Sequence, residues 1–478
     1  MIYTYMNMLM NAIPSRINKK TVLTAAVFFV LAVWGLTDVR HRAVIDPLNP
    51  EAHRTDFTVY TTAGSAMFAG LDPYTAANPR GWHYLYPPLF AILVSPLSGL
   101  DSQWQAVIWF FISLLMVWGC FAESRRIWKW LCSKDESAAE YGAAAYIFRL
   151  AGATALLPAL NCLQRGQVGI LLAYLLLLGF RVVLVNRSRW SALSGGVILA
   201  LPIAIKVIPA LPVAFLCVQL ALAAALNRRK RVPARRAAGT AIGAAFGLLL
   251  YLLVIPGMII GPAANAKHFQ SWVSGVLLNE EGKSDEDFSV HTKRNQSLTN
   301  AVYRLGNWAA HVFGGAESDL LVEAEDARAA LMYMDNEWVQ KGLRVIQIGL
   351  MLLLLLTCWK LARRDDPWGT AIVFSLACLA MSAISPVFRG HYYVLWLPAA
   401  WIVPLYCRRT GRSRTALALS VTACGLVAAH YLFLDWAGRV GALGLGATIW
   451  YAACAIAVLN AKQASGAARL KTRIINPG

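Results

Sequence analysis

Repeated apolar runs limit what this chain can fold into more than any other feature. They recur along nearly the whole sequence, each about 17–22 residues long, the length of a helix that crosses a bilayer. We expect about twelve spans, near residues 21–36, 104–122, 142–160, 167–185, 191–204, 207–226, 238–260, 343–361, 369–385, 393–406, 415–434 and 439–461. The predicted fold class is therefore an all-α polytopic membrane protein.

The overall composition excludes a soluble globular protein. Of the 478 residues, 58% are hydrophobic and only 14% are charged. The pair of spans within 191–226 is the weakest prediction, because about 36 residues are tight for two crossings at a rise of 1.5 Å per residue. This segment forms either two short helices or a re-entrant hairpin.

The net charge of +19 would suit nucleic-acid binding, but its distribution points to a membrane. The basic residues cluster between the predicted spans, at Arg125-Arg126, Arg228-Arg229-Lys230-Arg231, Arg363-Arg364, Arg408-Arg409 and Lys471 with Arg473. With twelve spans, all these clusters share one side, as the positive-inside rule requires of a cytoplasmic face. We expect a multi-pass protein of the cell membrane with both termini in the cytoplasm, and no nucleic-acid partner.

Two long polar segments then lie outside, as insertions in a single membrane domain spanning 1–478. The first exoplasmic loop, 37–103, contains a predicted amphipathic helix at 55–69, which Gly70 closes. The second exoplasmic loop, 261–342, is richer in acidic than in basic residues.

Within these loops we expect further local structure. The 55–69 helix should lie along the membrane surface. Leu85–Leu100 is apolar but broken by prolines, and so favours an interfacial helix over a span. In the second loop, a polar middle at Asn279–Thr292 precedes a more structured part from Arg294 to Trp308.

Several strong motifs are missing. The chain has no Walker loop, no dinucleotide glycine fingerprint after a strand and no HExxH pair. The nine cysteines are scattered and show no paired spacing. The first loop has no DxD-type acidic pair, so we expect no cofactor and no metal site.

Asp56 is the most informative polar residue, and two roles suit it. It precedes the predicted 57–69 helix, where aspartate is a good N-cap. It also lies in an outer loop beside aromatic residues, as a partly desolvated general base would. The two roles are compatible. Asp72, followed by Pro73, is instead typical of a turn.

Cations gather on the same outer side, where the positive-inside rule does not explain them. Lys206 lies between two short predicted spans, and either extends toward the aqueous interface or meets a fixed negative charge. The other polar groups at this level are Arg165, Asn295, Gln296, Arg304, Arg389 and His391. Any one of them can be an ordinary surface residue, but together they suit a lipid-linked phosphate.

The ordered motifs resemble one family. They are Asp56-Phe57 with Tyr60, Gly70-Leu71-Asp72-Pro73-Tyr74, Tyr86-Pro87-Pro88-Leu89, Gly166-Gln167, Lys206 with Pro209, Asn295-Gln296-Ser297, and Ser385-Pro386 with His391. From about residue 25 to 405, the chain resembles glycosyltransferase family 87, the DUF2029 group of GT-C membrane enzymes. The resemblance implies a GT-C-like fold and a polyprenyl-phosphate-sugar donor.

The resemblance also implies a set of site residues. Asp56 corresponds to the family's catalytic aspartate in the first exoplasmic loop. The residues expected to bind the donor phosphate or the substrates are Lys206, Arg165, Gln167, Asn295, Gln296, Arg304, Arg389, His391, Tyr60 and Tyr86. Two departures stand out: Gly169 replaces an asparagine found in many relatives, and His391-Tyr392 replaces paired histidines.

The predicted function is an inverting hexosyltransferase acting at the outer face of the membrane. It would move a mannose-like hexose from a polyprenyl phosphate to an envelope lipid or glycan acceptor. Two other classes use many spans: a transporter or lipid flippase, and a polymerase or ligase of surface polysaccharide. The first predicts inverted repeats and ionisable residues at the midplane. The second favours an arginine-rich outer loop without a base in the first loop.

Overall fold

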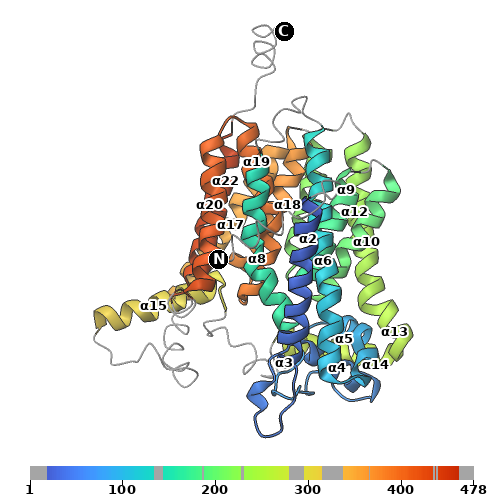
Figure 1. Cartoon of the computed structure of the whole chain (residues 1–478). Coiled ribbons are helices and arrows are strands. Elements are labelled where there is room, and N and C mark those ends of the chain that lie inside the picture. Colours follow the sequence, from blue (N-terminus) through green and yellow to red (C-terminus); the bar gives the residue numbers. More distant parts are fainter. Residues whose placement is uncertain are drawn as a thin grey trace, which may run out of the picture.

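The structure is a computed structural model that describes residues 19–133, 144–185, 188–227, 231–278, 295–314, 337–364, 366–433, 437 and 440–461. In these residues the regular elements are all helical, and β-type pairing is limited to two isolated bridges. Most of the long helices run side by side in a bundle (Figure 1). The chain is therefore an all-α polytopic membrane protein, as predicted.

The long helices follow the predicted spans in order. They are α2 (Lys19–Trp34), α6 (Ser102–Cys132), α8 (Ala145–Arg165), α9 (Gly169–Val185), α10 (Arg189–Ile205), α11 (Ala210–Leu226), α12 (Arg231–Leu249), α17 (Glu337–Ala362), α18 (Pro367–Ile384), α19 (Leu397–Arg409), α20 (Ser413–Leu432) and α22 (Ala442–Leu459). By length and composition, seven helices among the described residues can cross a membrane; α9, α10 and α11 are shorter apolar helices.

The structure decides between the two alternatives for one predicted segment and changes the bounds of two other spans. Residues 191–226 form two separate helices, α10 and α11, of 17 residues each, about 25 Å long. The α6 helix runs to Cys132, ten residues past its predicted end, so it carries Arg125, Arg126 and Lys129 as a helical extension of the basic side. The predicted span 393–406 begins as a 3-10 helix, η6 (Gly390–Trp396), and only its second part is α19.

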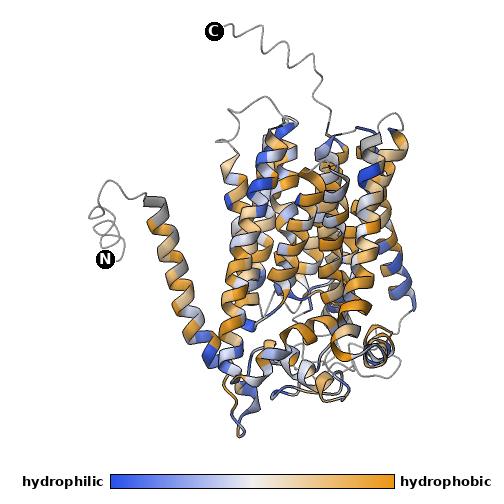
Figure 2. Ribbon diagram, turned by 90° about the vertical axis from the view of Figure 1, so that its right-hand side faces the viewer, coloured by the Kyte–Doolittle hydropathy of each residue, from blue (hydrophilic) through white to orange (hydrophobic). Residues whose placement is uncertain are grey.

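Apolar residues cover the sides of the bundle, and hydrophilic residues gather toward its ends (Figure 2). The α2 helix stands clear of the other helices in this view, and side chains such as Phe29 and Val30 are exposed along it. At the opposite extreme, α18 is almost entirely buried, and Phe374 stacks on Phe180 of α9 with ring centroids 4.2 Å apart.

The first loop folds into short helices under one end of the bundle, drawn at the bottom of Figure 1. They are η1 (Gly35–Val39), α3 (Arg40–Arg42), η2 (Pro50–Ala52), α4 (Phe57–Phe68), α5 (Pro88–Val94) and η3 (Ser95–Gly99). After α12, the chain continues as η4 (Leu250–Val254), α13 (Ile255–Ile260), α14 (Pro262–Trp272) and η5 (Val273–Leu277), and later α15 (Leu298–Gly314). The 279–292 segment and Arg294 lie outside the described residues.

The α4 helix is more deeply packed than the surface position predicted for it. Nine of its twelve residues are buried, on all sides of the helix, whereas Phe68 at its end is 54% exposed. Gly64 permits this packing, because a β-carbon there would lie 2.3 Å from the carbonyl oxygen of Ala91 in α5. Gly70 follows the helix with a φ of +74°, as the predicted closing glycine should.

Candidate active site

Asp56 lies at the centre of a buried polar cluster. Its side chain accepts two hydrogen bonds from Arg165, from Nε to Oδ2 at 2.9 Å and from Nη2 to Oδ1 at 3.2 Å. The amide Nε2 of Gln167 donates a third, to Oδ2. Asp56 is only 6% exposed. Oδ1 thus receives one of these bonds and Oδ2 receives two, so Oδ1 is the oxygen with more capacity to accept a proton.

The end of α8 positions this pair. Gly166 ends the helix in the left-handed region, at a φ of +69°, which favours glycine. A β-carbon on Gly166 would lie 2.9 Å from the β-carbon of Phe57. The backbone N–H of Asp56 donates to the carbonyl of Arg165 at 2.7 Å. The start of α4 and the end of α8 are therefore joined through backbone as well as side chains.

The expected N-cap role of the Asp56 side chain is not found. Asp56 occupies the N-cap position of α4 but makes no side-chain capping bond. Asp101 shows what a cap looks like in this protein: its Oδ1 accepts from the N–H of Gln103 at 2.8 Å, at the start of α6. Asp72 forms the predicted turn, because its Oδ1 accepts from the N–H of Tyr74. The carboxylate of Asp56 serves the cluster instead.

Tyrosines connect Asp56 to Lys206. The hydroxyl of Tyr60 donates to Oε1 of Gln167 at 3.3 Å, and the Tyr60 ring lies 5.5 Å from that of Tyr86 between centroids. Lys206 Nζ donates to the hydroxyls of Tyr86, at 3.1 Å, and Tyr392. The same ammonium lies 4.3 Å and 4.0 Å from the centroids of these two rings. Two tyrosines therefore enclose the lysine from both sides.

No carboxylate pairs with Lys206 among the described residues. Burial lowers the pKa of its ammonium, since a charge is less stable away from water. Burial alone would raise the pKa of Tyr86, but Lys206 and hydrogen bonds from Tyr392 and Tyr60 bring it below its ordinary value. The lysine thus stabilises negative charge placed next to it.

The turn that enters η6 brings Arg389 and His391 to the same end of the bundle. His391 is 2% exposed. Burial, together with Arg165, Lys206 and Arg389, lowers the pKa of His391 well below its usual range. Its imidazole is therefore neutral, not the additional cation that the sequence suggested.

Asn295 and Gln296 hold this turn in place. Oδ1 of Asn295 accepts from the N–H of Phe388 at 2.9 Å, and Nδ2 donates to the carbonyl of Pro386 at 3.0 Å. The N–H of Gln296 donates to the carbonyl of Phe388 at 2.8 Å. The Asn295 amide therefore uses its oxygen and its nitrogen to hold the backbone of this turn.

Arg304 lies on α15, the helix that packs against α18 and α22. Its Nε donates to Oδ1 of Asn300, one turn earlier, at 3.0 Å. Burial lowers its pKa to about 10. The bond to Asn300 joins Arg304 to its own helix.

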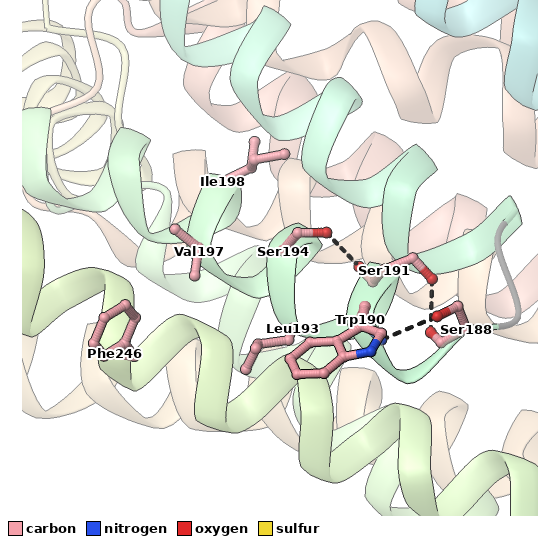
Figure 3. Close-up of a pocket in the computed structure, with 8 residues that line it drawn as sticks. All are labelled: Ser188, Trp190, Ser191, Leu193, Ser194, Val197, Ile198 and Phe246. Atoms are coloured by element: carbon pink, nitrogen blue, oxygen red, sulfur yellow. Dashed lines mark hydrogen bonds between the residues drawn. The ribbon is translucent and has the colours of Figure 1, made fainter.

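A groove on the side of the bundle has no part in this site. It lies between α10 and α12 and is lined by Ser188, Trp190, Ser191, Leu193, Ser194, Val197, Ile198 and Phe246 (Figure 3). Its serine hydroxyls bond to backbone groups of their own turn: Ser191 and Ser194 donate to carbonyls, and Ser188 accepts from the N–H of Trp190. Lys206 directly follows α10, eight residues after Ile198, which places it about 12 Å from Ile198 along the helix axis.

Comparison with known proteins identifies the family. The family model of glycosyltransferase family 87 matches residues 84–386, more than half of the chain. The chain belongs to glycosyltransferase family 87. No curated protein and no solved structure gives a significant match. The family membership makes this protein a membrane glycosyltransferase, with a sugar donor, an acceptor and membrane lipids as its partners.

The family 87 match covers only part of the cluster. Tyr86, Arg165, Gln167 and Lys206 fall inside it, whereas Asp56, Tyr60, Arg389 and His391 lie before or after it. Tyr392, which bonds to Lys206, was not in the predicted site. It follows His391 in a polar outer segment, which could have revealed it.

Proposed function

We propose that this family 87 member is an inverting hexosyltransferase that uses a polyprenyl-phosphate sugar. It moves a mannose-like hexose to an envelope lipid or glycan at the outer face of the cell membrane. One observation carries the donor assignment: Lys206, clamped by Tyr86 and Tyr392, has no carboxylate partner among the described residues, although Asp56 and Arg165 pair nearby. An ammonium in that setting suits a phosphate.

The chemical step follows from this arrangement. The acceptor hydroxyl oxygen attacks the anomeric carbon, and its proton passes to Oδ1 of Asp56. The bond from the anomeric carbon to the phosphate oxygen breaks, and the phosphate keeps the electron pair. A single displacement of this kind inverts the anomeric centre.

The other residues of the cluster have distinct parts in that step. Arg165 and Gln167 hold the Asp56 carboxylate in place. Lys206, with Arg389 close enough to interact with it electrostatically, stabilises the charge that develops on the leaving phosphate. The tyrosines Tyr60, Tyr86 and Tyr392 separate the base from the phosphate-binding lysine.

The outer location rests on the charge pattern of the sequence together with the fold. Arg165 is the last residue of α8, and Lys206 is the first residue after α10. Both lie at the end of the bundle that carries the first loop (Figure 1). The basic residues Arg364, Arg408 and Arg409 lie at the opposite ends of α17 and α19. The positive-inside rule makes that opposite end cytoplasmic.

The test is direct. Purified protein is incubated with a panel of polyprenyl-phosphate hexoses and a crude envelope lipid extract, and release of polyprenyl phosphate is measured. We expect release with at least one hexose, and inversion at its anomeric carbon in the product. Nucleotide-activated hexoses are tested in parallel for hexose transfer to the same extract. Transfer from these sugars with no release of polyprenyl phosphate from any polyprenyl-phosphate hexose would refute the donor assignment.

A further inference from the structure

Three side chains at or next to Gly390 each carry one buried polar atom without a hydrogen-bond partner in the part of the chain that the structure describes. These atoms are His391 Nε2, His430 Nδ1 and Tyr431 Oη. His391 and His430 are only 2% and 3% exposed. Buried polar groups are usually bonded, so a group of unpartnered ones points to something that binds there.

Gly390 allows these side chains to come together. A β-carbon at this position would lie 3.0 Å from Nε2 of His430 and 3.3 Å from Oη of Tyr431. Its φ is not in the left-handed region, so the backbone conformation does not require glycine here. Space for the two side chains of α20 is therefore the reason a larger residue does not fit.

These groups lie beside the proposed catalytic pair. The α20 helix packs against α8, which ends at Arg165. Both Tyr431 and His391 interact electrostatically with the Arg165 guanidinium. Hydrogen bonds and ring contacts lead from Asp56 through Gln167, Tyr60 and Tyr86 to Lys206, and the charge of Arg165 also acts on Tyr431.

The chemistry of the three groups selects their partner. A neutral imidazole offers one N–H donor and one nitrogen acceptor, and a phenol both donates and accepts. A sugar hydroxyl also donates and accepts, so it can bond to any of them. A phosphate only accepts hydrogen bonds and prefers cations, and the cation nearest these groups, Arg165, is already paired with Asp56.

We propose that His391, His430 and Tyr431 form the subsite that binds the hydroxyl groups of the acceptor sugar. This inference rests on the proposed function, because it assigns the second substrate of the same site. The attacking hydroxyl would then reach Asp56 from the Arg165 side, with the donor phosphate on the Lys206 side. His430 and Tyr431 would determine specificity without taking part in proton transfer.

Two small substitutions test the subsite. Tyr431→Phe removes only the hydroxyl, and His430→Gln keeps one polar group near the position of Nε2. Tyr451→Phe is the matched control, because that buried hydroxyl donates to the carbonyl of Leu350 at 2.9 Å, on α17. The probes are n-octyl hexopyranosides, whose binding to protein in lipid nanodiscs is measured by titration calorimetry.

We expect the wild type and Tyr451→Phe to bind at least one of these glycosides alike. Tyr431→Phe and His430→Gln should each weaken binding by about 2- to 12-fold, the range for losing one neutral hydrogen bond. Glycoside affinity unchanged in both variants, or no binding to the wild type, would overturn the subsite.

A second measurement separates this inference from the proposed function. Release of polyprenyl phosphate to water, without any acceptor, should proceed in both variants with the wild-type KM for the donor. A matching rise in donor KM would contradict the assignment to the acceptor. If the glycoside result holds but no polyprenyl-phosphate sugar is cleaved by the wild type, the donor proposal fails and the subsite stands.

Discussion

Asp56 and Arg165, 109 residues apart in the chain, form a two-point ion pair with N–O distances of 2.9 Å and 3.2 Å. A bidentate pair fixes the orientation of the carboxylate as well as its position. The pair also engages Arg165, which the sequence analysis predicted to bind the donor phosphate. The predictions below separate the base, its arginine and the phosphate-binding cations.

Asp56→Asn should abolish most of the turnover while leaving the fold intact. The amide keeps the size of the side chain but cannot accept the acceptor's proton, and general-base catalysis is typically worth about 10²–10⁴-fold. The measurement is kcat with saturating donor and acceptor. Asp101→Asn is the control, because asparagine also caps a helix and the Asp101 side chain caps α6 in the part of the chain that the structure describes. Near-normal kcat in Asp56→Asn would refute the mechanism.

Arg165→Lys should lower kcat by about tenfold or more and leave donor KM nearly unchanged. Lysine retains the charge but loses the fork that holds both carboxylate oxygens, and a bond to a charged group is worth about 1.5–3 kcal/mol. Arg80→Gln is the control, since that arginine lies in the same loop and pairs with Glu51. A rise in donor KM at constant kcat would instead indicate that Arg165 binds the donor phosphate.

Lys206→Met and Arg389→Gln should weaken donor binding, by about tenfold or more for Lys206. Methionine keeps much of the apolar stem, so the Tyr86–Tyr392 clamp should keep its packing. Product inhibition by polyprenyl phosphate alone is the measurement, because it reports phosphate contacts without the sugar. Lys360→Met, at the other end of the bundle, is the control. Unchanged inhibition in both variants would remove these residues from the site.

Cysteines placed at the two ends of the helix bundle should react from opposite sides of the membrane. Thr75 and Ser413 are both exposed, in the first loop and at the start of α20. Cysteines placed at these positions, in a background without the nine native cysteines, should react with an impermeant reagent from opposite sides. Reaction of Ser413→Cys but not of Thr75→Cys from outside in intact cells would place the proposed site on the wrong face.

Acid should destabilise the first loop through His53. Its Nδ1 lies 3.2 Å from the carbonyl of Val44, which can only accept, and its Nε2 lies 2.7 Å from the Thr58 hydroxyl. Burial lowers the pKa of His53 below 6.5, so the unfolded chain takes up the proton first. Stability is therefore complete above about pH 6.5 and falls as the pH drops toward the folded-state pKa.

Thermal unfolding in detergent between pH 7.5 and 5 measures this effect. His53→Gln should reduce the loss of stability over that range, and His41→Gln, at an exposed position, should not change it. An identical pH dependence in the wild type and His53→Gln would show that other groups control acid sensitivity.

The sequence predicted most of the helices because bilayer length and charge bias are strong, local signals. It located α4 within two residues and placed Asp56 at its start. It could not show that α4 is buried on all sides, since that depends on Gly64 meeting α5. It also could not show whether Asp56 caps a helix or meets Arg165, because both residues suit either role until α8 is placed beside the loop.

The cations illustrate the same limit. Lys206 was recognisable because a lysine at the outer end of a short span is unusual. Its enclosure by Tyr86 and Tyr392 depends on residues 120 and 186 positions away. Asn295 looked like a substrate ligand, but both ends of its amide hold the turn before η6. His430 lies on a span that the prediction treated as uniformly apolar, so nothing in the local pattern linked it to His391.

Because of the backbone bond from Asp56 to Arg165, the first loop and the end of α8 should be exchanged together in chimaeric enzymes. A chimaera in which only residues 37–103 come from a relative would keep Arg165 and Gly166 from this chain. The aspartate of the relative's loop would then pack against an α8 end that fits a different loop. Working hybrids should therefore be recovered only when the segment ending α8, through Gln167, travels with the loop.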